Sequence, residues 1–228
     1  TPPAAADELI LYMTGIPAQT MLNDEEPGMA LEITRAAAKR ANIKLDERFV
    51  PWARAVKTVE KSKNAIIIPF SRIPSRERRF VWIGQLYALK FGFVSLDTSV
   101  DDKAAARKLE RIGVWRASSM QEELEKDGFQ NIVPIANDRV LSHLLIGRRI
   151  NAWYGSLTEA GYKFRHIKEI NRAKIRFGKP VREQPVWLAG GLGLSRYIAL
   201  KLTKAMQSLE TDKLITPILS NYVFSLLN

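Results

Sequence analysis

The sequence contains no cysteine and only two histidines. The absence of cysteine excludes disulfide frameworks, thiolate metal sites and cysteine nucleophiles. His143 and His166 have no clustered carboxylates at metal-ligand spacing, so we expect neither a metal ion nor a cofactor. For each histidine, a structural or surface role is a better explanation than a role as a general base. With so few candidate groups, we expect that the chain is not an enzyme.

Long apolar runs are also missing, since no stretch approaches the roughly 18 consecutive apolar residues that span a bilayer. The 228 residues suffice for one large domain or for two lobes of about 100 residues each. Residues 1–6 carry no signal-peptide pattern and lead directly into the strand-like segment 9–12. Such a start fits a mature form whose export signal has been removed, or a boundary within a longer protein, and the residues leave this choice open.

Acidic residues are outnumbered, with 24 aspartates and glutamates against 35 lysines and arginines and a formal charge of +11. Nucleic acid, anionic lipid and anionic small molecules are all candidate partners for such a chain. The one dense basic stretch is 163–182, which contains eight lysines and arginines and a single acidic residue, Glu169. Phe164 and Phe177 are its only phenylalanine, tyrosine or tryptophan residues, too few for the interleaved series on which a single strand stacks. A solvated surface is therefore the favoured interpretation, and we expect no nucleic-acid partner.

Strand-like apolar runs alternate with helical patterns along the chain. Helices are expected in the segments 29–37, 52–59, 137–147, 194–208 and 212–220, and a capping box within 117–122 opens a further helix. Strand-like runs lie between them, at 9–12, 43–50, 65–68, 80–83, 87–94, 111–114, 132–135, 150–154 and 184–188. The alternation predicts an α/β fold with mostly parallel sheets, and its two short series predict two lobes.

Two loops at the ends of predicted strands carry candidate binding groups, because open α/β sheets bind ligands beyond the carboxyl ends of their strands. The loop 69–76 follows a buried strand and offers the hydroxyl of Ser71 and the guanidinium groups of Arg72 and Arg76, and arginine holds a carboxylate in a bidentate fork. The loop 115–119 ends in a capping box, where the free N–H groups of a helix start favour an anion. A surface arginine and an ordinary capped helix explain the same residues equally well.

The order of these segments identifies a resemblance that covers nearly the whole chain. The residues that carry it are Gly28 to Pro69, Ser71 to Tyr87, Ile112 to Val114, Leu145 to Ala152 and the final helices. Together they resemble the bacterial extracellular solute-binding proteins of family 3, the periplasmic binding components of polar amino acid ABC transporters. Each motif is degenerate by itself, and the specificity lies in the ordered series.

The resemblance implies the type II periplasmic-binding-protein architecture. In that architecture, each lobe is a mostly parallel sheet flanked by helices, and two hinge strands join the lobes. On this sequence, lobe one would be residues 1–89 with 187–228, and the inserted lobe two would be residues 90–186. The hinges would lie near 88–94 and 182–188.

The resemblance also implies a set of ligand-binding residues. Arg76 falls on the family's ligand arginine and Ser71 on a hydroxyl ligand before it, while Ser118 and Ser119 fall on the hydroxyls of lobe two. Candidates for an aromatic wall around the ligand are Trp52, Trp82, Trp115, Trp153 and Tyr154, although a lone tryptophan belongs more often to a core.

Two positions depart from the family pattern. Ser156 stands where amino-acid-binding members place a carboxylate for the ligand ammonium, and Asn151 replaces the usual aspartate of the preceding segment. A buried ammonium without a counter-charge costs several kcal/mol. The ligand is therefore a carboxylate without a free amine, or Glu25 or Glu26 supplies the missing acid.

The function implied by the resemblance is that of a monomeric periplasmic receptor. It would close around a small anionic or zwitterionic solute, a carboxylate or an amino-acid-like molecule, and deliver it to the permease of an ABC importer. Three alternatives stay open: a sensing module of a larger receptor or cell-wall lytic enzyme, a dehydratase of cyclic acids on the same scaffold, and nucleic-acid binding through 163–182.

Overall fold

The computed structural model describes residues 7–116, 118–137, 140–168 and 171–222. These residues form two compact units. Unit 1 contains the described residues of Thr1–Ala88 and Pro185–Tyr222, and unit 2 contains those of Leu89–Gln184. No helix in the described part of the chain is long and apolar enough to cross a membrane. Each unit is described by itself below.

The sheet of unit 1 is built around the buried strand β3 (Ala65–Ser71). Strand β1 (Asp7–Met13) runs parallel both to β3 and to β2 (Ile43–Phe49), whereas β9 (Arg182–Gly191) runs antiparallel to β3. The strand order is β2-β1-β3-β9, followed by β4. The continuous apolar run of β3 agrees with this central place, because a strand covered on both faces has no polar side.

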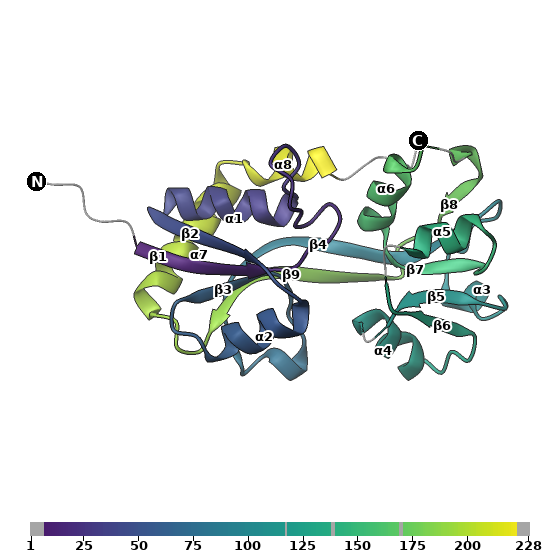
Figure 1. Cartoon of the computed structure of the whole chain (residues 1–228), viewed down its shortest axis with the longest axis horizontal. Coiled ribbons are helices and arrows are strands. Elements are labelled where there is room, and N and C mark those ends of the chain that lie inside the picture. Colours follow the sequence, from purple (N-terminus) through teal and green to yellow (C-terminus); the bar gives the residue numbers. More distant parts are fainter. Residues whose placement is uncertain (1–6, 117, 138–139, 169–170, 223–228) are drawn as a thin grey trace, which may run out of the picture. The chain divides into compact units, whose positions relative to one another are not determined.

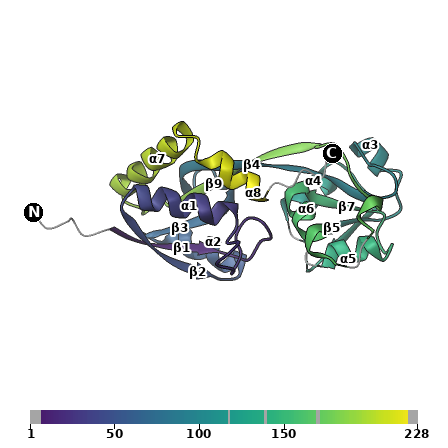
Figure 2. The ribbon, with the colours of Figure 1, turned by 90° about the horizontal axis from the view of Figure 1, so that it is seen from above.

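Helices cover both faces of this sheet (Figure 1). One face carries α1 (Met29–Arg40) and α7 (Arg196–Thr211), which pack against each other, and the other face carries α2 (Trp52–Lys61). The last described helix, α8 (Ile215–Tyr222), packs against α1, as Figure 2 shows from above.

Tyr222 fastens α8 to the start of α1. Its hydroxyl oxygen accepts a hydrogen bond from the backbone N–H of Gly28 at 3.1 Å and donates one to the carboxylate of Glu32. Gly28 has a positive φ of 100°, and a Cβ there would lie 2.4 Å from the carbonyl carbon of Gln19. Only glycine allows this close approach of two backbone segments.

The sheet of unit 2 has the strand order β4-β7-β5-β6, with β8 also paired to β4. Strand β5 is parallel to both β6 and β7, and β4 is antiparallel to β7 and β8. The bounds are β4 Phe80–Leu96, β5 Ile112–Trp115, β6 Ile132–Ile135, β7 Ala152–Ser156 and β8 Ile175–Phe177. Pro134 lies in the edge strand β6, where a missing backbone donor is tolerated.

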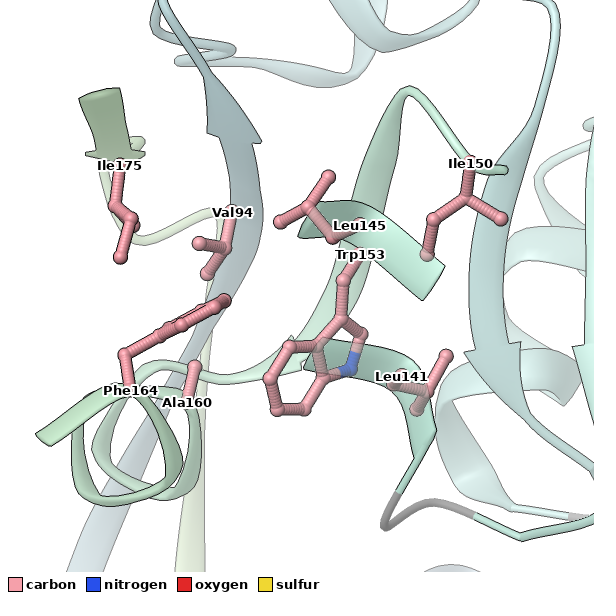
Figure 3. Close-up of a cluster of buried hydrophobic side chains, with 8 residues drawn as sticks. All are labelled: Val94, Leu141, Leu145, Ile150, Trp153, Ala160, Phe164 and Ile175. Atoms are coloured by element: carbon pink, nitrogen blue, oxygen red, sulfur yellow. The ribbon is translucent and has the colours of Figure 1, made fainter. Parts of the chain in front are cut away.

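The helices of unit 2 lie on the two faces of its sheet, with α5 and α6 on one face and α4 on the other (Figure 1). Their bounds are α3 Lys103–Ala106, α4 Ser119–Lys126, α5 Leu141–Ile146 and α6 Leu157–His166. Figure 3 shows the apolar cluster on the α5 and α6 face. Its side chains are Val94, Leu141, Leu145, Ile150, Trp153, Ala160, Phe164 and Ile175.

The α/β prediction is confirmed, and several elements differ in extent. The separate strands expected at 80–83 and 87–94 are one continuous strand, β4, of 17 residues. Gly84, near the start of this strand, does not interrupt it. A Cβ there would lie 3.0 Å from Cγ of Met206, so the glycine lets α7 approach the strand. The chain passes between the two units in β4 and in β9.

Two helical segments also differ from expectation. The helix expected at 137–147 is α5, Leu141–Ile146, and residues 138–139 lie outside the described residues. Helix α6 was not predicted, because basic residues obscure the apolar pair Ala160 and Phe164 that the helix buries.

Candidate functional site

Arg76 and Ser71 lie together at the end of β3. A short 3-10 helix, Pro74–Arg76, follows the strand and turns the Arg76 side chain back toward it. The Arg76 guanidinium lies 4.4 Å above the ring of Phe70, and its Nη1 donates a hydrogen bond to the Ser71 carbonyl oxygen at 3.2 Å. Phe70 is completely buried, so its ring holds the half-buried guanidinium in a fixed position.

The other arginine of this loop has a different environment. Arg72 forms a bidentate ion pair with Glu77, in which Nε lies 2.8 Å from Oε2. The hydrogen bond from Arg72 holds the pKa of Glu77 below its usual value. The Arg72 guanidinium also lies 5.3 Å from the ring centre of Trp82 and 4.8 Å from that of Trp187. Arg72 thus already holds a carboxylate, whereas Arg76 rests on a carbonyl and a ring.

In unit 2, the ends of β5 and β7 lie at one edge of the sheet, because the two strands are parallel neighbours. Ser118 follows β5 and caps α4, as the capping-box pattern predicts. Its Oγ accepts a hydrogen bond from the backbone N–H of Gln121 at 3.3 Å and donates one to the Trp115 carbonyl at 2.6 Å. The Ser118 hydroxyl is therefore committed to the backbone.

Ser119 is the first residue of α4 and has a different environment. Its Oγ lies 3.7 Å from the sulfur of Met120, which is a weak acceptor. The residue is half-buried. Of the two serines predicted to bind ligand, Ser119 has the hydroxyl that is better able to turn toward a ligand.

Ser156 ends β7 and caps α6. Its Oγ accepts a hydrogen bond from the backbone N–H of Glu159 at 3.2 Å, and the residue is 1% exposed. Asn151, which precedes the strand, accepts a hydrogen bond from the backbone N–H of Arg111 at 2.8 Å through Oδ1. Both residues thus hold backbone in place, Asn151 before the start of β7 and Ser156 at its end.

The expected aromatic wall is wrong for Trp153 and Tyr154, which are 2% and 0% exposed in the interior of unit 2. Trp115 is half-buried and packs against the apolar cluster of the same unit. In unit 1, Trp52 and Trp82 pack around Phe70, with ring centres 5.8 and 5.5 Å from it. Most of these rings thus pack against the cores of their own units.

The remaining candidates lie at the surface or in loops. His143 and His166 are exposed, and Nδ1 of His166 lies 2.8 Å from the Tyr162 carbonyl oxygen. Glu25 is exposed and Glu26 half-buried in the loop before α1. Among the described residues, no three histidine, aspartate or glutamate side chains are grouped as a metal site requires.

Sequence reasoning missed an ionic cluster on the α4 face of unit 2. We call it the Glu123 cluster, and its members are Lys103, Glu123, Asp127, Tyr154 and Arg182. Lys103 Nζ lies 2.7 Å from Glu123 Oε1 and 2.6 Å from Asp127 Oδ2. The Tyr154 hydroxyl donates to Glu123 Oε2 at 2.8 Å, and Arg182 Nε lies 3.1 Å from the same oxygen.

The cluster shifts the proton affinity of its members. Burial, together with the hydrogen bond to Glu123, raises the pKa of the Tyr154 hydroxyl far above its usual value. The hydrogen bond from Lys103 holds the pKa of Asp127 below its usual range. The only hint in the sequence was the spacing of Glu123 and Asp127, one helical turn apart.

Comparison with known proteins gives matches in structure alone. No protein-family model and no curated protein matches the sequence. A probable amino-acid ABC transporter extracellular-binding protein from Bacillus subtilis superposes with a TM-score of 0.82 at 12% identity, over 96% of this chain and 98% of the other. A histidine kinase sensor domain described as similar to periplasmic binding proteins gives 0.81 at 13% identity, over 96% and 97%.

A third solved structure, an ancestral arginine-binding protein bound to arginine, gives a TM-score of 0.77 at 13% identity, over 96% of this chain and 100% of the other. Identities this low establish the fold alone. The chain therefore has the periplasmic-binding-protein fold over almost its entire length, as its sequence pattern predicted.

The buried hydroxyl of Tyr154 gives a direct test of the Glu123 cluster. A folded-state pKa raised above the usual value of about 10 stabilises the fold below that pH, and this contribution is lost as the pH rises further. We expect the Tyr154→Phe variant to lose stability less steeply than the wild type above about pH 10.

The measurement is urea unfolding as a function of pH, with tyrosinate absorbance as a second readout. At about pH 11, the folded wild type and the Tyr154→Phe variant should give the same tyrosinate signal, because Tyr154 stays protonated until unfolding. A smaller signal in the variant would show that the hydroxyl ionises in the folded state.

Proposed function

We propose that the chain is a solute receptor of the periplasm, which binds a small carboxylate-bearing molecule and delivers it to an ABC importer. The observation that carries the proposal is Arg76, whose guanidinium is seated on Phe70 beside Ser71 at the carboxyl end of a parallel strand. Arginine in such a place presents the planar fork that fits a carboxylate. The comparisons support this proposal, since two of the matched structures are described as binding proteins for amino-acid transport or for arginine.

In this proposal the two units are the two lobes, and one ligand takes groups from both. The lobe boundaries predicted from the sequence, after residues 89 and 186, lie one or two residues beyond those of the units. Unit 1 gives Arg76 and Ser71. Unit 2 gives Ser119 and the N–H groups at the start of α4, which Ser118 orients, while Trp115 and Ser156 shape the same edge. Ligand binding favours the state in which both units contact it, because only that state gains every contact.

We propose that the protein acts as a monomer and by binding alone, without turnover. Both histidines, the residue type most often used as a general base, are exposed. Ligand binding favours one conformation of the protein, and the permease recognises that conformation.

A second function uses the same binding chemistry. The similarity to a histidine kinase sensor domain favours a ligand-sensing module of a larger receptor. The coding sequence on either side of this chain distinguishes the two: a sensor continues into a membrane helix and a signalling domain, whereas a transport receptor is encoded beside a permease.

Arg76 is tested by isothermal titration calorimetry with a panel of small mono- and dicarboxylates and the common amino acids. For any member that binds, we expect Arg76→Ala to weaken the affinity by about 30- to 1,000-fold, since a ligand carboxylate then loses its charged partner. Arg78→Ala is the matched control, because Arg78 is exposed two residues further along the same loop. Equal affinities for wild type and Arg76→Ala would remove Arg76 from the site.

The two serines of α4 are predicted to separate stability from binding. Ser118→Ala removes a helix cap and should lower the free energy of unfolding by about 1 kcal/mol. Ser119→Ala should leave the unfolding free energy unchanged and weaken ligand binding several-fold, because its hydroxyl is not used as a cap. Urea unfolding and calorimetry on both variants check this. A Ser119→Ala variant with wild-type affinity would contradict the assignment.

A further inference from the structure

Arg182 is a largely buried guanidinium that unit 2 leaves incompletely hydrogen-bonded. Its side chain is 21% exposed, and its Nε lies 3.1 Å from Oε2 of Glu123. Among the described residues, Nε and Nη2 are nevertheless buried atoms without a partner at hydrogen-bond geometry. Buried donors are almost always hydrogen-bonded in folded proteins, and an unmet donor costs folding free energy. These two nitrogens therefore need a hydrogen-bond acceptor that the described residues do not provide.

The register of the strands places Arg182 near the end of β7. Its guanidinium lies 4.2 Å above the ring of Phe91. Phe91 is paired with Ser156, the last residue of β7, and two residues further along β4 Phe93 is paired with Tyr154. These four side chains share one face of the sheet, because pairs two residues apart along a strand point to the same side.

This face is the one that α4 covers. Tyr154 and Arg182 both reach Glu123 of α4, and the first turn of that helix carries Ser119. Arg182 thus belongs to the same end of unit 2 as the residues that we assign to ligand binding, and the assignment uses contacts within unit 2 alone.

The charges of the Glu123 cluster decide which ligand group suits this place. Lys103 holds both carboxylates of the cluster, so neither Glu123 nor Asp127 is left to receive a ligand ammonium. Ser156, at the end of β7, is neutral. An ammonium would therefore meet a guanidinium of like charge, whereas a carboxylate would supply the acceptors that Arg182 lacks.

We propose that Arg182 is a second ligand-binding arginine and that the ligand is a small dicarboxylate without an amino group. This inference rests on the proposed function: Arg76 takes one carboxylate, and Arg182 takes the other at the end of β7. In this inference, two arginines, Arg76 and Arg182, determine the specificity.

The test is calorimetry with the alkane dicarboxylates from malonate to adipate, their monocarboxylate counterparts of equal length, and L-glutamate. We expect the wild type to prefer its best dicarboxylate over the matching monocarboxylate by about 10- to 100-fold. In Arg182→Gln this ratio should fall to about one, while the affinity for the monocarboxylate is unchanged. Arg182→Lys keeps the positive charge but cannot form the bidentate contact of a guanidinium. Its preference for the dicarboxylate should therefore lie between those of Arg182→Gln and the wild type.

A purely structural role of Arg182 gives a different result. Arg182→Gln would then weaken mono- and dicarboxylates by the same factor, with a matching loss of thermal stability, and the inference would be overturned. Glu123→Gln separates the two roles in a second way. This variant removes a negative charge that competes with the ligand for Arg182. We therefore expect the preference for the dicarboxylate to persist or rise, although the free energy of unfolding falls. A loss of that preference would count against the inference.

The failure of the inference and of the proposed function can be told apart. A wild type that binds L-glutamate or a monocarboxylate as tightly as any dicarboxylate overturns the inference and leaves the receptor function standing. In that case Glu159→Gln, in the first turn of α6, shows whether Glu159 receives an ammonium. A wild type that binds no carboxylate contradicts both proposals.

Discussion

Parallel strands of one sheet end at a common edge, and both units of this protein depend on that constraint. In unit 1 the parallel strands β1, β2 and β3 bring the loop of Arg76 to one edge. In unit 2 the parallel strands β5, β6 and β7 bring the starts of α4 and α6 to one edge. The edges collect helix starts and polar side chains that are far apart in the sequence. The candidate site follows from this geometry in each unit.

The alternation of side chains along a strand divides unit 2 into an apolar and a polar face. Trp153 and Tyr154 are consecutive in β7 and point to opposite faces of the sheet. Trp153 packs in the apolar cluster under α5 and α6, whereas Tyr154 donates its hydroxyl hydrogen to Glu123 under α4. A charged network can thus lie one residue away from an apolar core. It does so at low cost because most of its polar groups are paired, and Arg182 is the exception.

Local patterns in the sequence predicted much of the fold. The apolar run of β3, the helical spacing of α1 and the capping box at Ser118 each depend on neighbouring residues, and each is present in the structure. The extent of β4 was misjudged. Two strands were expected at 80–83 and 87–94, yet the chain continues through Gly84 in one unbroken strand, where the glycine allows the close approach of α7.

The candidate site was predicted only in part, for a physical reason. Ser71 and Arg76 are five residues apart, and their proximity follows from one strand and one turn. The Glu123 cluster instead joins residues of α3, α4, β7 and β9, whose proximity depends on the tertiary fold. In the sequence, Arg182 was the last residue of a basic stretch and the first of a predicted hinge, and neither placed it beside Glu123.

The central claim is that one ligand takes groups from both units, and a distance measurement tests it most directly. The chain has no cysteine, so spin labels at Lys57→Cys on α2 and Lys126→Cys on α4 are unique, and both positions are exposed. Double electron–electron resonance should show a shorter and narrower distance distribution when the best carboxylate of the calorimetric panel is bound. The same shift should be absent when Arg76→Ala is added. A ligand that binds by calorimetry and leaves the distance distribution unchanged would contradict the account.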